Sequence, residues 1–456
     1  MSSIESYLEQ HADGFVSELF ELLRIPSVSA DPAHAGDIGQ AGQWVADKLA
    51  EIGFSSEVIP TKGHPIVCAE SPKVEGAPTV LVYGHYDVQP ADPLDLWDSP
   101  PFEPEIRDGH IYARGATDDK GQVLTHVFSA RAWLETVGAL PVNLKYLIEG
   151  EEEVGSEALS EFVAENADRL ACDCIVVSDG SQFGPGQPAI TYGLRGIACF
   201  EITVKGPERD LHSGSFGGSI TNPAVALSRM LTALINDDGK VQVPGFYEDV
   251  VPLTDFEREQ LAMLPFDEQQ YFRQVGVSDS WGESGFSTLE RRWARPTFDI
   301  SGLTSGYQGE GAKTIIPSRA SAKISFRLVP NQSPEAIGKA LQTMLQELAP
   351  AGVIVEIEGM HGAPGLLVPL DSPYVTAASK ALEQAFGRSP VMAREGGSIP
   401  VVATLHNELK ADALLIGWGQ DDDNPHSPNE RFSVVDFHRG IRASAQLWKE
   451  IGALEK

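Results

Sequence analysis

The sequence has few cysteines and a shortage of basic residues. Among 456 residues there are 4 cysteines, and 34 Lys and Arg stand against 65 Asp and Glu, which gives a formal net charge of −31. The cysteine spacing fits neither a zinc ribbon nor a CxxC redox pair, so free thiols in a reducing compartment are predicted. Because so negative a field repels phosphate backbones and anionic lipid surfaces, we expect neither nucleic acid nor a membrane as partner.

Long apolar runs are also missing. No run approaches the roughly 18 residues of a membrane span, and the N-terminus has no basic segment followed by an apolar one. The sequence therefore predicts a cytoplasmic protein. Hydrophobic residues make up 42% and charged residues 22% of the chain, as in ordinary globular domains, and the length predicts two or three of them.

Apolar periodicity predicts an α/β fold. Apolar residues at helical spacing predict a helix over 4–23. Short apolar runs predict buried strands, separated by helical segments, over 78–88, 141–150 and 172–180. Strands that alternate with helices indicate a mostly parallel sheet flanked by helices.

The pattern changes near residue 196. From there to about residue 366 the order strand, helix, strand, helix, strand predicts a separate α+β domain, and the α/β pattern then returns. We therefore expect a discontinuous first domain, 1–195 and 367–456, with a second domain, 196–366, inserted into it.

Imidazoles and carboxylates follow the predicted strands. His85 and Asp87 stand in GHYDV, Asp179 in VVSDG, and three consecutive glutamates in IEGEEEVGS. Asp118 lies in ATDDKG before a helix, and His426 lies in NPHSPNE. Each motif alone has a structural explanation: a turn, a helix cap or a solvated acidic face. Together they predict a metal site at the ends of the strands, with nitrogen and oxygen ligands suited to zinc, cobalt or manganese.

The motifs occur in an order that resembles the metallopeptidase M20 family, and within it the branch of cytosolic nonspecific dipeptidase and carnosinase. The resemblance covers nearly the whole chain and rests on GHYDVQP, ARGATDDKG, EGEEEVGS, SDG, RDLHSG, GAKTIIPS, SFRLVPNQ, REGGSIP and PHSPNE. It implies a catalytic α/β domain and an inserted α+β domain that serves as lid and dimerisation domain.

The resemblance also implies two divalent metal ions in each subunit, with zinc expected and manganese or cobalt as alternatives. His85 and Asp179 would bind one ion. His426 and Glu153 would bind the other, and Asp118 would bridge the two.

Two further acids receive catalytic roles from the resemblance. Asp87 would orient His85, and Glu152 would be the general base. Because Glu151 makes three acids in a row, a register shift among the three glutamates stays open. The VGS that follows favours Glu152 as the base.

Four residues are implied in substrate binding. His212 would reach the active site of the other subunit of a homodimer, and Arg327 would hold the substrate carboxylate. Thr314 and Ser398 would assist.

The prediction is thus a metal-dependent dipeptidase that acts on small peptides. An N-acyl-amino-acid amidohydrolase or a carboxypeptidase of the same superfamily is the first alternative, and a non-catalytic metal-binding scaffold is the second. Asp179, where the acylases usually have Glu, argues against the first alternative. The retained Glu152 argues against the second.

Overall fold

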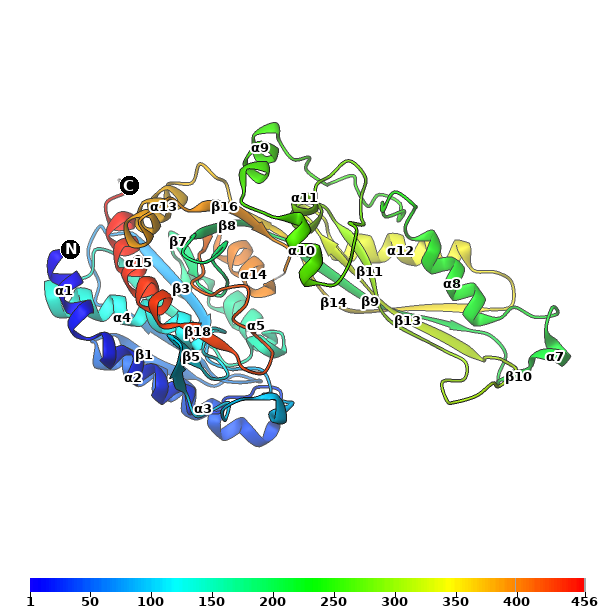
Figure 1. Cartoon of the computed structure of the whole chain (residues 1–456), viewed down its shortest axis with the longest axis horizontal. Coiled ribbons are helices and arrows are strands. Elements are labelled where there is room, and N and C mark those ends of the chain that lie inside the picture. The colour runs from blue at the N-terminus through cyan, green and yellow to red at the C-terminus, as the bar shows by residue number, and fades with distance from the viewer. Residues whose placement is uncertain (398, 455–456) are drawn as a thin grey trace. The chain divides into compact units, whose positions relative to one another are not determined.

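A computed structural model describes residues 1–397 and 399–454 of the chain (Figure 1). These residues form two compact units. The first unit comprises Met1–Tyr192, Val368–Ala393 and Thr404 to the C-terminal helix, and the second comprises Gly193–Leu367 and Arg394–Ala403.

The first unit is built on a mixed sheet in the order β1-β2-β6-β3-β7-β17-β8, with β16 also paired to β8. Four adjacent strands in its centre are parallel: β6 with β3, β3 with β7, and β7 with β17. Pairs on either side, such as β2 with β6 and β17 with β8, are antiparallel. The strands are β1 (Ser55–Ile59), β2 (Ile66–Glu70), β3 (Thr79–His85), β6 (Asn143–Glu149), β7 (Cys174–Val177), β8 (Ala189–Leu194), β16 (Val391–Glu395) and β17 (Asp412–Leu415).

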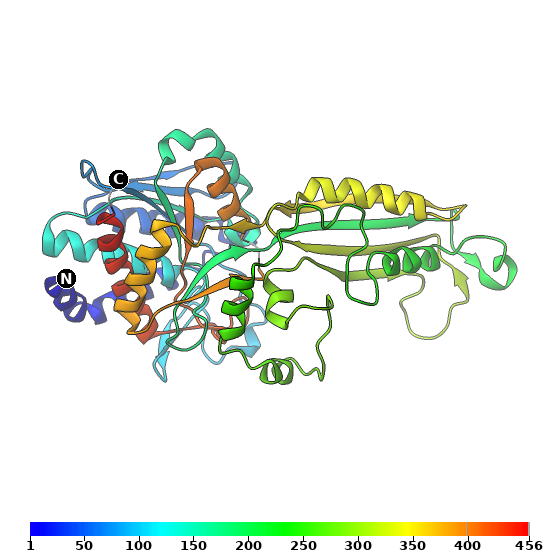
Figure 2. The same cartoon turned by 90° about the horizontal axis from the view of Figure 1, so that it is seen from above.

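Helices lie on both faces of this sheet (Figure 2). The long helix α15 packs against α4 and α13, and α3 packs against β1 and β2. A small sheet in the order β18-β5-β4 lies in the same unit. These elements are α1 (Ser2–Gln10), α2 (Ala12–Leu23), α3 (Ala35–Glu51), β4 (Glu105–Arg107), β5 (His110–Tyr112), α4 (Lys120–Val137), α5 (Glu157–Glu165), α6 (Ala167–Leu170), α13 (Pro373–Phe386), β18 (Arg431–Ser433) and α15 (Val434–Gly452). Helix α14 (Pro400–Leu409) begins in the second unit and ends in the first.

The second unit has a four-stranded antiparallel sheet in the order β11-β13-β9-β14. Alternate side chains of β9, such as Phe200 and Ile202, share one core with α8 and α12, so both helices cover the same face. The elements are β9 (Gly196–Lys205), β10 (Leu211–His212), α7 (Ser213–Phe216), α8 (Pro223–Ala233), α9 (Asp255–Met263), α10 (Glu268–Gln274), α11 (Thr288–Trp293), β11 (Thr297–Ser305), β12 (Ile315–Ile316), β13 (Arg319–Leu328), α12 (Pro334–Leu348), β14 (Ile354–Ala363) and β15 (Leu366–Leu367).

The predicted fold class is confirmed: parallel strands form the centre of an α/β unit, and an α+β unit is inserted into its sequence. Local details differ from the expectations. The helix expected over 4–23 is divided at His11, whose backbone has φ −105° and ψ 7°. In the part of the chain that the structure describes, no helix is long and apolar enough to cross a membrane.

Candidate active site

The predicted site residues of the first unit follow the ends of its four parallel strands. His85 is the last residue of β3, and the three glutamates follow β6. Asp179 follows β7, and His426 lies on the loop after β17. Because the carboxyl ends of neighbouring parallel strands meet at one edge of a sheet, these side chains converge there.

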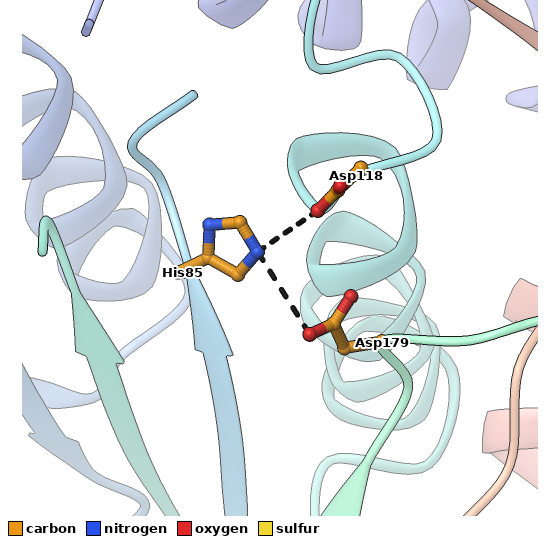
Figure 3. A group of neighbouring side chains, drawn as sticks. All are labelled: His85, Asp118 and Asp179. Carbon is orange, nitrogen blue, oxygen red and sulfur yellow. Dashed lines mark hydrogen bonds and ion pairs between the residues drawn. The ribbon is translucent and has the colours of Figure 1, made fainter. Parts of the chain in front are cut away.

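His85, Asp118 and Asp179 form the first group of possible metal ligands (Figure 3). The His85 Nε2 atom lies 3.1 Å from Asp118 Oδ1 and 4.0 Å from Asp179 Oδ2. Figure 3 shows both carboxylates directed at this nitrogen, one from the loop before α4 and the other from the end of β7. The His85 side chain is fully buried and both carboxylates are mostly buried, so water screens this concentration of charge less than it would at the surface.

The second nitrogen of His85 faces Asp87. Nδ1 lies 3.1 Å from the backbone carbonyl oxygen of Asp87 and 3.3 Å from its Oδ1. Because a carbonyl oxygen only accepts hydrogen bonds, Nδ1 carries the proton, and in the neutral ring Nε2 presents its lone pair to Asp118 and Asp179. A lone pair opposite two carboxylate oxygens fits a cation held between them, and this donor set suits a divalent metal ion.

Asp118, Glu153 and His426 form the second group of possible ligands. The His426 Nε2 atom lies 3.0 Å from Asp118 Oδ2 and 3.2 Å from Glu153 Oε2. Asp118 therefore faces His85 with one oxygen and His426 with the other, which is the arrangement expected of a bridging carboxylate. Gln89 donates a hydrogen bond of 2.9 Å to Glu153 Oε2.

The pKa values of these groups are shifted because several carboxylates lie close together in a buried place. Burial raises the pKa of Asp179 to about 7, and the nearby Asp118 adds to this rise. Hydrogen bonds to Asp118 and Glu153 raise the pKa of His426 to about 10. Burial lowers the pKa of His85, but its hydrogen bonds to Asp118 and Asp87 raise it well above its ordinary value. Surroundings that stabilise a proton on an imidazole in this way would also stabilise a metal ion there.

The three consecutive glutamates have different surroundings. Glu153 faces His426. Glu151 instead accepts a hydrogen bond of 2.9 Å from the backbone N–H of His64, on the loop between β1 and β2. Burial raises the pKa of Glu152 to about 8, and the charges of Asp179, Glu153 and Asp118 act in the same direction. The charges that act on Glu152 are those of predicted metal ligands, whereas Glu151 is bound to a different loop. Glu152 as the general base stays a prediction.

Asp119 is the N-cap residue of α4, but its side chain makes no capping hydrogen bond. Its Oδ2 atom instead accepts a hydrogen bond of 3.2 Å from the backbone N–H of His85. The residue is fully buried at the start of α4, and it thereby ties the loop of Asp118 to the end of β3.

The predicted substrate-binding residues that the structure describes lie in the second unit. His212 and Thr314 are close together, because β10 pairs with β12 and the backbone N–H of Ser213 donates to the Thr314 carbonyl oxygen at 3.1 Å. Arg327 lies on β13, partly buried, opposite Thr297 of β11. Ser398 lies outside the described residues.

Two residues that hold this site in place received no role from the sequence. Gln89 is the sixth residue of GHYDVQP, and its contact with Glu153 joins the segment after β3 to the segment after β6. Glu430, the last residue of NPHSPNE, accepts the backbone N–H of Asp118 at 3.1 Å. Motif membership was the only signal for either residue.

Comparisons with known proteins show the family of the chain. The sequence profile of the peptidase family M20/M25/M40 matches residues 81–450. The chain therefore belongs to this family of peptidases, and it is a metallopeptidase.

The individual relatives are similar to the chain over its full length. A Cys-Gly metallodipeptidase of Schizosaccharomyces pombe is 32% identical and covers 100% of this chain and 99% of its own. A human Beta-Ala-His dipeptidase is 32% identical, with 100% of this chain and 93% of its own covered. The resemblance to the dipeptidase branch and the predicted enzyme class, a metal-dependent dipeptidase, are confirmed.

Solved structures show the same fold. The structure of human carnosine dipeptidase 1 aligns with a TM-score of 0.82 at 32% identity and covers 99% of both chains. An M20 family metallo-carboxypeptidase of Sulfolobus solfataricus aligns with a TM-score of 0.86 at 32% identity over 96% of this chain and 99% of its own.

Proposed function

We propose that the chain hydrolyses the peptide bond of dipeptides with two divalent metal ions and with Glu152 as general base. The observation that carries the proposal is the position of Asp118. Its two oxygens face two imidazoles, His85 at 3.1 Å and His426 at 3.0 Å, and each imidazole has an acid of its own beside it. His85 and Asp179 would hold one ion, His426 and Glu153 the other, and Asp118 both. Zinc is the expected metal, with manganese or cobalt as alternatives.

Two ions held in this way would polarise the scissile carbonyl and lower the pKa of an attacking water molecule. The protein must still move the proton. Glu152 would take it from the water and deliver it to the nitrogen of the leaving amine. A buried carboxylate near the ligands is suited to both steps, since two bound cations would favour its charged form before the transfer and burial favours its protonated form after it.

Asp87 would fix the position of the base relative to the metal ligands. Its carboxylate accepts the backbone N–H groups of Glu152 and Glu153, at 3.2 and 3.1 Å, while it faces Nδ1 of His85. The same buried acid thus fixes the tautomer of a metal ligand and the backbone that carries the base.

The neutral ring of His212 has the tautomer that an oxyanion partner needs. Its Nδ1 accepts the backbone N–H of Gly214 at 3.0 Å, so in the neutral ring the proton is on Nε2, which can donate. We propose that His212 acts in the active site of a partner subunit in a homodimer. Arg327 would bind the carboxylate of the peptide, aided by Thr314 and Ser398.

A carboxypeptidase is the second candidate. The observation in its favour is the similarity to the M20 family metallo-carboxypeptidase, whose identity to the chain equals that of the human dipeptidase structure. Both reactions use the same metal site and the same substrate carboxylate, so they differ in how much peptide precedes the cleaved bond.

A substrate panel separates the candidates. The purified chain, loaded in turn with zinc, manganese and cobalt, is assayed on dipeptides that include Cys-Gly and β-Ala-His, on longer peptides and on N-acetylated amino acids. Dipeptide hydrolysis with little activity on the other two classes is the expected result. Faster release of a C-terminal residue from longer peptides would establish the carboxypeptidase, and faster deacetylation would establish the amidohydrolase.

A further inference from the structure

The Glu430 carboxylate is fully buried and accepts four hydrogen bonds from one short loop, residues 114–118. Oε2 accepts from Arg114 Nη1 at 2.7 Å and from the backbone N–H of Gly115 at 2.9 Å. Oε1 accepts from the backbone N–H groups of Thr117 at 2.9 Å and of Asp118 at 3.1 Å. A carboxylate with both oxygens occupied in this way fixes the backbone of the loop, because hydrogen bonds to a charged acceptor are the strong ones.

The segment that carries Glu430 also carries His426, four residues earlier. The backbone carbonyl oxygen of Glu430 accepts the N–H of Ala113 at 3.2 Å, so main chain and side chain of one residue both hold this loop. Upstream of His426, Asp423 accepts a hydrogen bond of 3.2 Å from the hydroxyl of Thr117. The loops that present His426 and Asp118 are therefore joined on both sides of His426.

We propose that Glu430 is a positioning residue that sets Asp118 against His426 and so determines how tightly the metal ions are held. The inference rests on the proposed two-metal function. Asp118 can face both imidazoles only if its own backbone is fixed relative to the loop of His426. Glu430 provides this link, because it accepts the Asp118 N–H from a position in the His426 segment.

Replacement of Glu430 by glutamine tests this link with little change of shape. One carboxylate oxygen becomes an NH₂ group, which donates hydrogen bonds and would face donors: either Arg114 and Gly115, or Thr117 and Asp118. Two of the four hydrogen bonds to the Glu430 side chain would be replaced by donor–donor contacts. Glu18→Gln is the matched control, since Glu18 on α2 accepts two hydrogen bonds from Arg131, at 2.6 and 2.8 Å, in the same unit.

The experiment is a zinc titration of the full-length apo-protein against a chromophoric chelator, with kcat and KM measured on the reloaded enzyme. For Glu430→Gln we expect zinc affinity to fall by about 10-fold to 100-fold. We also expect a lower kcat and a thermal unfolding midpoint that stays above the assay temperature. Glu18→Gln should keep the wild-type zinc affinity. Glu430→Asp, which keeps the charge but shortens the side chain, should recover part of the affinity.

Wild-type zinc affinity in folded Glu430→Gln would overturn the proposal. Equal losses of affinity in Glu18→Gln would overturn it as well, since they would reflect a general loss of stability. If Glu430→Gln does not fold, Glu430→Asp is titrated in its place and must bind zinc more weakly than the wild type. Failure of both to fold would assign Glu430 to folding instead and overturn the proposal. The two-metal function itself fails separately, if the wild-type chain binds fewer than two ions.

Discussion

The backbone N–H of Glu152 donates a hydrogen bond of 3.2 Å to the Asp87 carboxylate, across a sequence separation of 65 residues. The second oxygen of Asp87 accepts the N–H of Glu153 at 3.1 Å. Asp87 follows β3 and the two glutamates follow β6. These strands are parallel and adjacent, so the sheet itself brings the two segments together. The acid predicted to orient His85 therefore also holds the loop of the proposed base.

Asp87→Asn should lower kcat by about 10-fold to 100-fold, the usual effect of altering a residue that orients metal ligands. The amide NH₂ would face either the backbone N–H of Glu153, or that of Glu152 together with the Nδ1–H of His85. The measurement is kcat together with metal content. Asp173→Asn is the control, because Asp173 likewise accepts one backbone N–H, from Thr79 at 2.7 Å, at the opposite end of β3. An Asp87→Asn enzyme with wild-type kcat would contradict this role.

Glu152→Gln should lower kcat by on the order of 10²-fold or more while the metal content stays near that of the wild type, since it removes a proton acceptor and no ligand. Steady-state kinetics and metal analysis on the same preparation check this. Glu153→Gln should lose metal. Glu151→Gln should neither lower kcat nor lose metal, because Glu151 binds the backbone N–H of His64. Metal loss in Glu152→Gln with retention in Glu153→Gln would place the base one residue away.

Metal analysis should find two divalent ions per chain, and a chelator should abolish activity that added zinc, manganese or cobalt restores. Protons compete with metal for the His426 imidazole. Hydrogen bonds to Asp118 and Glu153 raise the pKa of this imidazole to about 10. Metal affinity should therefore weaken as pH falls. A chain with one ion that is fully active would exclude the two-metal mechanism.

His126 should make the fold less stable in mild acid. It is fully buried between the hydroxyls of Ser178 and Ser444, at 2.8 and 3.0 Å, and burial lowers its pKa from 6.5 to about 3. The unfolded chain takes up a proton below about pH 6.5 and the folded chain does not, so this contribution is complete above pH 6.5 and declines as pH falls toward 3. The slope is at most about 1.4 kcal/mol per pH unit.

The check is the change in the thermal unfolding midpoint between pH 6.5 and 5, compared between the wild type and His126→Asn, because Asp179, whose pKa burial raises to about 7, also titrates near this range in both proteins. As pH falls, the midpoint of the wild type should lose more, relative to its value at pH 6.5, than that of His126→Asn. His11→Asn, a substitution at an exposed histidine, serves as control and should leave the dependence unchanged. Equal slopes in the wild type and His126→Asn would exclude the buried imidazole as the cause.

The sequence predicted most of what depends on local pattern. The apolar runs of β3, β6 and β7 are buried on both faces in a parallel sheet, which makes them easy to find, and the ligand candidates follow their ends. Strand β11 was not predicted. It is the edge strand of its sheet and most of its residues are exposed, so its sequence lacks the alternation that marks a half-buried strand.

Contacts between distant segments could not be predicted from one sequence. Glu430 and Asp118 are separated by 312 residues, and nothing local to either motif indicates that the first accepts the N–H of the second. The grouping of Arg394–Ala403 with the second unit could not be predicted either. It depends on contacts between distant segments, such as that between Arg195 Nε and the Gly396 carbonyl oxygen at 3.0 Å.

Complementation between two inactive chains should test whether His212 serves a neighbouring subunit. His212→Ala and Glu152→Gln chains are mixed under conditions that allow subunits to exchange. In the heterodimer, one site combines an intact Glu152 with an intact His212 from the partner, because closed two-fold symmetry gives each site one residue from each chain. Activity should rise to about half that of a wild-type dimer. If exchange is demonstrated by mass-labelled subunits and no activity returns, His212 acts within its own chain or has only a structural role.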